Sequence, residues 1–171
     1  MMKIQLRWVT AAICAALCAS AAAKELVVAG LSIDWPEGYE RAADENPARI
    51  SCPDGVTVLL TIWGPNGAEP AGGQQQRAFE RLASDRMPEL AAAAGKVVLP
   101  LREEQLANGQ ILLSTGSQSV EGGAQQFYLQ YFLATSSGMA ALVTIEGPGA
   151  ALVQERRFRP LVASGTWKHA R

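Results

Sequence analysis

Residues 124–146 read AQQFYLQYFLATSSGMAALVTIE, two apolar runs joined by the short connection Ser136-Ser137-Gly138. Neighbouring strands joined by so short a connection must pair antiparallel. The first run has apolar side chains on both faces, for example Phe127 on one face and Tyr128 on the other. Two apolar faces predict a layer of structure on each side of the sheet, or one layer and a partner. These residues therefore predict an antiparallel strand pair inside the protein.

Two more strands precede this pair and extend it to a four-stranded meander. Each connection is short and contains Gly or polar residues, which favours tight turns between adjacent strands. The four expected strands are 96–106, 110–117, 124–135 and 139–146, and the connections contain Asn108-Gly109, Glu121-Gly122-Gly123 and Ser136-Ser137-Gly138.

The region before the meander predicts three more strands. A run rich in Val, Leu and Ile at 26–33 ends at the turn sequence Trp35-Pro36-Glu37-Gly38. A short strand at 48–52 and a longer one at 56–63 flank Pro53-Asp54-Gly55, which favours a hairpin. Both faces of the longer strand are largely apolar, so we expect it to be central and well covered.

Two segments have helical spacing of apolar residues, at 74–94 and at 150–164. Pro88 predicts a kink in the first helix or a junction of two helices, and Pro160 an irregular last turn of the second. Gly95 is a suitable stop for the first helix. The fold class expected from these elements is α+β, an antiparallel sheet of about six to seven strands with helices packed on it.

The first 23 residues predict a secretory signal peptide. Lys3 and Arg7 precede an apolar run at 8–18, and small residues follow at 19–23. Cleavage there leaves a single domain at 24–171, expected in the periplasm or secreted. This mature chain has 13 basic residues, 15 less the two removed, against 16 acidic ones. A nucleic-acid partner is not expected, because such proteins normally have an excess of basic residues. A transmembrane segment is not expected in the mature chain either, because no apolar run in it is long enough to cross a bilayer.

Three segments of the mature chain resemble the Mog1/PsbP-like family. They are LSIDWPEGY at 31–39, ALVTIEG at 141–147 and RFRPLVAS at 157–164. The resemblance implies an α/β/α sandwich and a non-enzymatic interaction domain, because family members are mostly binding or assembly modules. It carries over no catalytic residue. The chain departs from the family pattern at Pro88 and in the Gly- and Pro-rich loop 64–73.

The sequence offers little for catalysis or cofactor binding. Cys52 and His169 are the only thiol and imidazole of the mature chain, so a Cys-dependent hydrolase is one alternative. A small buried Cys and a terminal His are the more ordinary interpretation. We expect no catalytic residue, no cofactor and no metal site, because the usual zinc, calcium and phosphate-binding patterns are missing.

Aromatic and arginine side chains near turns and on the last helix are the candidates for partner binding, since both types are frequent interface anchors. The alternatives are a solvated helix face for the arginines and closure of the core for the tryptophans. The candidate residues are Trp35, Trp63, Asn66, Arg156, Arg157, Arg159 and Trp167.

The leading hypothesis is therefore an exported, non-catalytic protein-binding or assembly module with an envelope or secreted protein as partner. The alternative is a periplasmic inhibitor or immunity protein that blocks a cell-wall hydrolase or a secreted toxin, using the loop 64–73 or another protruding connection. The identity of the partner and the oligomeric state are left open.

Overall fold

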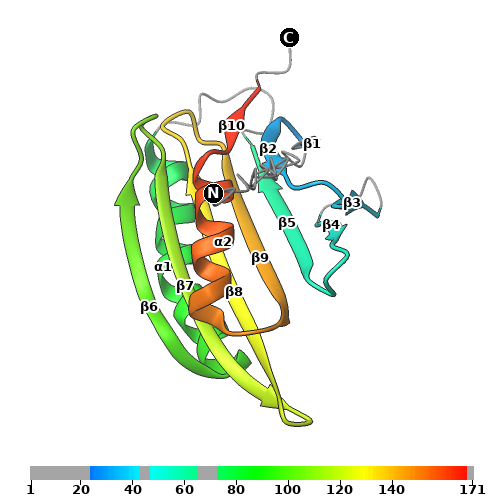
Figure 1. The fold of residues 1–171 in the computed structure, drawn as a ribbon. Coiled ribbons are helices and arrows are strands. Elements are labelled where there is room, and N and C mark those ends of the chain that lie inside the picture. Colours follow the sequence, from blue (N-terminus) through cyan, green and yellow to red (C-terminus); the bar gives the residue numbers. More distant parts are fainter. Residues whose placement is uncertain (1–23, 43–46, 65–72, 169–171) are drawn as a thin grey trace, which may run out of the picture.

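The structure is a computed structural model that describes residues 24–42, 47–64 and 73–168 (Figure 1). It has the expected α+β class, with a seven-stranded antiparallel sheet in the order β3-β4-β5-β9-β8-β7-β6 and a small sheet in the order β1-β2-β10. The strands of the large sheet are β3 Glu40–Arg41, β4 Ala48–Ser51, β5 Thr57–Trp63, β6 Lys96–Gln105, β7 Ile111–Glu121, β8 Ala124–Ala134 and β9 Ala140–Pro148. The predicted signal peptide lies outside the described residues.

The predicted meander is confirmed. β6, β7, β8 and β9 pair antiparallel with their sequence neighbours. β7 and β8 are the longest strands, and their pairing runs without interruption from Ile111↔Ala134 to Glu121↔Ala124. The quoted segment 124–146 supplies two adjacent inner strands of the sheet, and β9 joins the meander to β5.

The sheet has cover on both faces. Helix α1 (Gly73–Ala94) packs on β6, β7 and β8 from one side, and α2 (Ala151–Ala163) packs on β8 from the other (Figure 1). The main core joins the α2 side of the sheet to the small sheet, with Phe158 and Leu31 fully buried there. A second, smaller core that contains Met87 lies under α1. This layering agrees with the α/β/α sandwich that the resemblance implies.

The small sheet differs from expectation. Instead of one strand at 26–33, the chain forms β1 (Lys24–Val28) and β2 (Leu31–Trp35), which pair antiparallel. The turn between them uses Ala29 and Gly30 with φ of 45° and 90°, a left-handed pair suited to two-residue hairpins. A third strand, β10 (Thr166–Trp167), pairs with β2. Strands of two residues have no sequence pattern, which is why β3 and β10 were missed.

Strand β5 is central, as expected, but is well covered on one face only. Val58, Leu60 and Ile62 are buried in the main core, while the residues between them are half-buried. The reason is the position of α1, which packs over β6 to β8 rather than over β5.

Each helix continues through an internal proline. α1 is one helix of 22 residues with Pro88 inside it, so the two-helix alternative is wrong, and Pro160 lies within α2. α1 ends at Ala94, directly before Gly95, as predicted. In the part of the chain that the structure describes, neither helix has the length and hydropathy of a membrane span.

Candidate functional site

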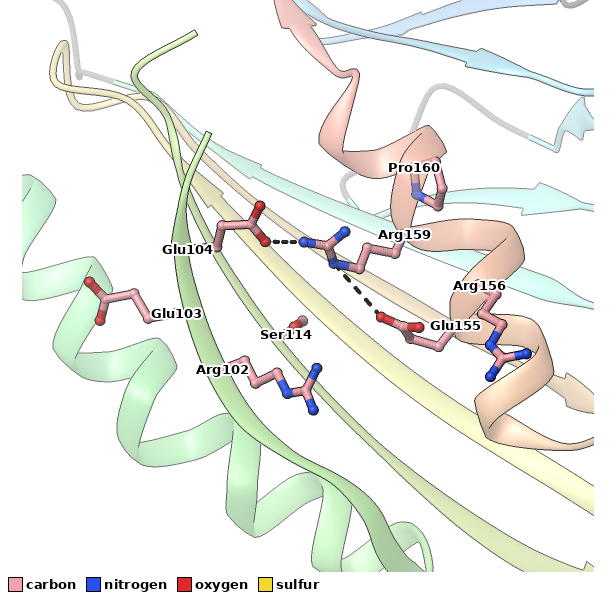
Figure 2. Close-up of a pocket in the computed structure, with 8 residues that line it drawn as sticks. All are labelled: Arg102, Glu103, Glu104, Ser114, Glu155, Arg156, Arg159 and Pro160. Carbon is pink, nitrogen blue, oxygen red and sulfur yellow. Dashed lines mark hydrogen bonds and ion pairs between the residues drawn. The ribbon is translucent and has the colours of Figure 1, made fainter. Parts of the chain in front are cut away.

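A polar groove of about 580 Å³ lies between α2 and the strands β6 and β7 (Figure 2). A volume of this size falls within the range of small-molecule and peptide-side-chain sites. Its lining is dominated by charged side chains, in contrast to the apolar pockets usual for drug-sized ligands. The lining residues are Arg102, Glu103, Glu104, Ser114, Glu155, Arg156, Arg159 and Pro160.

Strand register and helix periodicity bring these residues together from distant parts of the sequence. Arg102 of β6 pairs with Ser114 of β7. Because side chains alternate along a strand, Arg102 and Glu104 face α2, whereas Glu103 points to the opposite side, toward α1 (Figure 2). On α2, residues 155, 156 and 159 lie within one turn of each other and line the other wall.

Arg159 ties the two walls together. Its guanidinium forms an ion pair with Glu104 of β6 and a second, at 3.7 Å, with Glu155 of its own helix. In Figure 2 the contact with Glu104 spans the groove, whereas the contact with Glu155 runs along α2. The two carboxylates therefore neutralise the positive charge of Arg159, and little of that charge is left for a ligand.

Arg102 and Arg156 have no such partner. Arg102 extends from the β6 wall and Arg156 from the α2 wall (Figure 2), and neither makes an ion pair or side-chain hydrogen bond with another described residue. A guanidinium presents a planar fork of donors that fits a carboxylate or phosphate with two parallel hydrogen bonds. The groove can thus hold an anionic group against the guanidinium of Arg102 or of Arg156.

A buried tyrosine lies next to this site. Tyr131 of β8 pairs with Ser114 across the strand boundary and is 1% exposed. Its hydroxyl has no hydrogen-bond partner among the described residues. Burial raises the pKa of Tyr131 well above its usual value; the carboxylate of Glu155 adds to the rise and Arg159 opposes it. The hydroxyl is therefore neutral and keeps its proton in the charged surroundings of the groove.

The arginines predicted on the last helix do not form one patch. Arg156 and Arg159 line the groove, but Arg157 lies on another side of α2. It donates hydrogen bonds to the Tyr39 hydroxyl and to the Asp54 carboxylate, both at 2.5 Å, and its guanidinium lies 4.7 Å from the centroid of the Phe158 ring. Arg157 thus links α2 to the β4–β5 turn.

Cys52 is buried, next to Tyr39. Burial raises the pKa of its thiol to about 11, which is opposite to what an activated nucleophile needs. The proposed partner of a nucleophilic Cys52, His169, lies outside the described residues. Across those residues no group of three or more His, Cys, Asp or Glu side chains is arranged to hold a metal ion.

The tryptophan candidates occupy three different environments. Trp35 is fully buried and stacks on Tyr39 at 5.6 Å between ring centroids, so it offers no surface to a partner. Trp63 is half-buried and lines an apolar pocket of about 240 Å³ between α1 and the sheet. Trp167 is half-buried against the main core. Asn66, the remaining candidate, lies outside the described residues.

Sequence reasoning missed Arg102, Ser114 and Tyr131. The alternation of residues 102–104 indicates that Arg102 and Glu104 share a face, but it does not say what lies opposite them. That depends on the register of β6 against β7 and on the position of α2, both of which are long-range features.

Comparison with solved structures finds a similar fold in a distant protein, and a second structure is reported with it. A protein from Bacteroides thetaiotaomicron superposes with a TM-score of 0.58 and 10% identity, over 86% of this chain and 49% of that one. The present chain thus spans about half the length of the Bacteroides chain. A mutant of Mog1 superposes with a TM-score of 0.49 and 9% identity, over 86% of this chain and 97% of Mog1. No protein-family model and no curated protein matches the sequence.

Proposed function

We propose that this chain is an exported, non-catalytic binding module of Mog1/PsbP-like type, whose groove between α2 and β6 holds an acidic segment of an envelope or secreted protein. One observation carries the proposal: Arg102 and Arg156 line opposite walls of the groove, and neither has an ion-pair partner among the described residues. Unpaired guanidinium groups in a concave site attract and orient carboxylates.

The other groups of the groove support binding rather than chemistry. Glu104 and Glu155 are engaged with Arg159, so neither is free to act as a general base toward Ser114. The lining contains neither His nor Cys. The concave shape favours a narrow protein segment, which can enter the groove, over a flat membrane surface, which cannot follow its walls.

Export rests on the pattern of the first 23 residues. The expected result is a mature protein that begins near Ala22 or Lys24, and the intact mass of the protein recovered from the periplasm or medium measures this directly. A full-length chain that begins at Met1 and stays in the cytoplasm contradicts the proposal.

The groove is tested by charge reversal. The mature protein and a variant with Arg102→Glu and Arg156→Glu are immobilised, and partners captured from an envelope extract are identified by mass. Wild type should retain a stoichiometric protein partner that the double variant loses. Arg81→Glu is the matched control, because Arg81 is an exposed arginine on α1, away from the groove.

Two results contradict the proposal. One is capture of the same partner in the same amount by the double variant, which moves the binding surface elsewhere. The other is retention of nothing but small molecules or glycans by the wild-type protein. Loss of capture in Arg81→Glu as well shows a general charge effect and also counts against the groove.

A further inference from the structure

β6 lies at the edge of the seven-stranded sheet. It pairs with β7 and with no other described strand, so its outer side carries unpaired backbone groups (Figure 1). The other edge strand, β3, has two residues, whereas β6 has ten. An exposed edge of this length is a template for an added strand.

The hairpin at the end of β6 shows which residues point outward. The N–H of Leu106 donates to the carbonyl of Gln110 at 2.8 Å, so these two residues form a hydrogen-bonded pair. Such pairs alternate along an antiparallel ladder. Glu104 and Arg102 therefore bond inward to β7, while the backbone N–H and C=O groups of Glu103 and Gln105 face the free edge.

The usable edge is short. From Arg102 to Gln105 the register against β7 is regular, but it shifts twice between Val97 and Arg102, around Pro100. Proline has no N–H to donate, and bulges twist an edge away from a partner. An added strand thus has one regular stretch to pair with, residues 102–105, and this stretch includes Arg102 of the groove.

We propose that the partner segment adds as a strand to residues 102–105 of β6, with an acidic side chain opposite Arg102 on the groove face. This inference rests on the proposed function and specifies how that groove is occupied. Side chains directly opposite on adjacent strands lie about 5 Å apart between Cβ atoms. An acidic residue at that place can pair with Arg102 at the outer rim of the groove.

The charge pattern favours such a segment over a second copy of this chain. Two copies pairing antiparallel about Glu103 place that carboxylate against its own symmetry mate, and like charges directly opposite are destabilising. The same pairing sets Arg102 against Glu104, which is already bound to Arg159. An extended segment with one acidic residue opposite Arg102 and uncharged residues opposite Glu103 and Glu104 has neither conflict.

The test removes outward N–H groups without touching the β6–β7 ladder. Glu103→Pro and Gln105→Pro each delete one outward donor, and Glu103→Ala and Gln105→Ala are the matched controls that keep it. The probe is a fluorescein-labelled, capped octapeptide of Val and Thr with one central Glu, compared with the same peptide carrying Lys in place of Glu. Fluorescence anisotropy gives the affinity of each variant, and thermal melts check that it is folded.

The acidic peptide should bind wild type and both alanine variants, and each proline variant should lose at least tenfold in affinity. Peptide binding to the wild-type protein should also slow amide hydrogen exchange at Glu103 and Gln105 more than at Glu104, whose N–H is already bonded. This second measurement holds even where a proline variant fails to fold.

Four results overturn the proposal. Proline variants that bind as well as their alanine controls, or unchanged exchange at both outward amides, leave the groove as a side-chain site, and the proposed function then stands alone. Equal or tighter binding of the Lys peptide reverses the charge argument. A concentration-dependent dimer that Gln105→Pro abolishes shows that the occupant is a second copy. Failure of the capture experiment, by contrast, removes the proposed function itself.

Discussion

Arg156, Arg157 and Arg159 lie within four positions of one helix and have different surroundings. Arg156 has no ion-pair partner among the described residues, Arg159 bridges to Glu104, and Arg157 packs on Phe158. The difference follows from helical geometry, since each step along the helix rotates the side chain by about 100°. Charge alone did not distinguish them in the sequence.

Arg157 should contribute to stability rather than to binding. Arg157→Ala removes a hydrogen bond to Tyr39 and the stacking on Phe158, and we expect it to cost about 1–2 kcal/mol of unfolding free energy. Asp54→Asn should cost less than about 1 kcal/mol, because that ion pair is partly exposed. Urea unfolding measures both. An Arg157→Ala variant as stable as Arg156→Ala contradicts this role.

Cys52 should be nearly inert at neutral pH. Its thiol pKa is raised from 9.0 to about 11, so the thiolate is about a hundredfold scarcer than in the unfolded chain. Iodoacetamide should therefore label the native protein about a hundredfold more slowly than the protein in urea. Labelling at the unfolded rate shows that the thiol is accessible and reopens the hydrolase alternative.

The same shift makes stability depend on alkaline pH. The folded state holds the Cys52 proton more tightly than the unfolded state, so this contribution is complete below pH 9 and is lost as the pH rises through 11. Unfolding free energy should fall over that window, and the fall should be smaller in Cys52→Ala. Equal slopes for the two proteins contradict the assignment. Neighbouring tyrosines add to the decline in both.

At the scale of elements, local patterns predicted the meander and both helices. Short Gly-bearing connections indicate that adjacent strands pair antiparallel, and alternation or helical spacing of apolar residues indicates whether a segment is a strand or a helix. Both signals are local in the sequence, so the meander and the helices could be predicted without knowing long-range contacts. The hairpin at Ala29 and Gly30 was missed because a non-glycine residue occupies a left-handed position there. Pro88 predicted a kink or a junction of two helices, and the structure has one helix, α1, that contains Pro88 and packs on the sheet.

The groove could not be predicted from the individual helices and strands alone. Its α2 wall was partly predicted, through Arg156 and Arg159. Its sheet wall was not, because Arg102 belongs to the site only through the register of β6 and the crossing of α2 over the sheet. Sequence patterns specify which face a residue shares with its neighbours, but not which element covers that face.

The junction of α1 and β6 should be intolerant of any side chain at Gly95. A Cβ there would lie 2.6 Å from the carbonyl oxygen of Gln118, a backbone atom that cannot move independently of β7. We expect Gly95→Ala to cost about 1–3 kcal/mol, measured by urea unfolding. A cost below about 0.5 kcal/mol shows that the helix end shifts freely and contradicts close packing at this junction.

At the scale of the whole molecule, the two ends of the described chain meet in the small sheet. β1 and β10 flank β2 on either side, so residues near Glu25 and near Lys168 lie together. The backbone N–H of Lys168 also donates to the carbonyl of Gly30 at 2.6 Å. The C-terminal strand thus closes the main core over β2 after α2 has packed on the large sheet.

Trp167 should be the residue that makes this closure stable. Its ring packs on the main core, whereas the ion pair between Lys168 and Glu25 is largely exposed. Trp167→Ala should cost about 2 kcal/mol and lower the Tm by about 4–8 °C, and Lys168→Ala should lower it by less than about 2 °C. Differential scanning calorimetry of the mature protein measures both.

A third variant separates packing from hydrogen bonding at the same position. The indole Nε1 of Trp167 is buried without a hydrogen-bond partner among the described residues, and an orphaned donor is destabilising. Trp167→Phe keeps an aromatic ring and deletes that donor, so it should melt within about 2 °C of wild type. A loss as large as that of Trp167→Ala shows that the indole nitrogen is satisfied in solution and that closure depends on its hydrogen bond rather than on apolar contact.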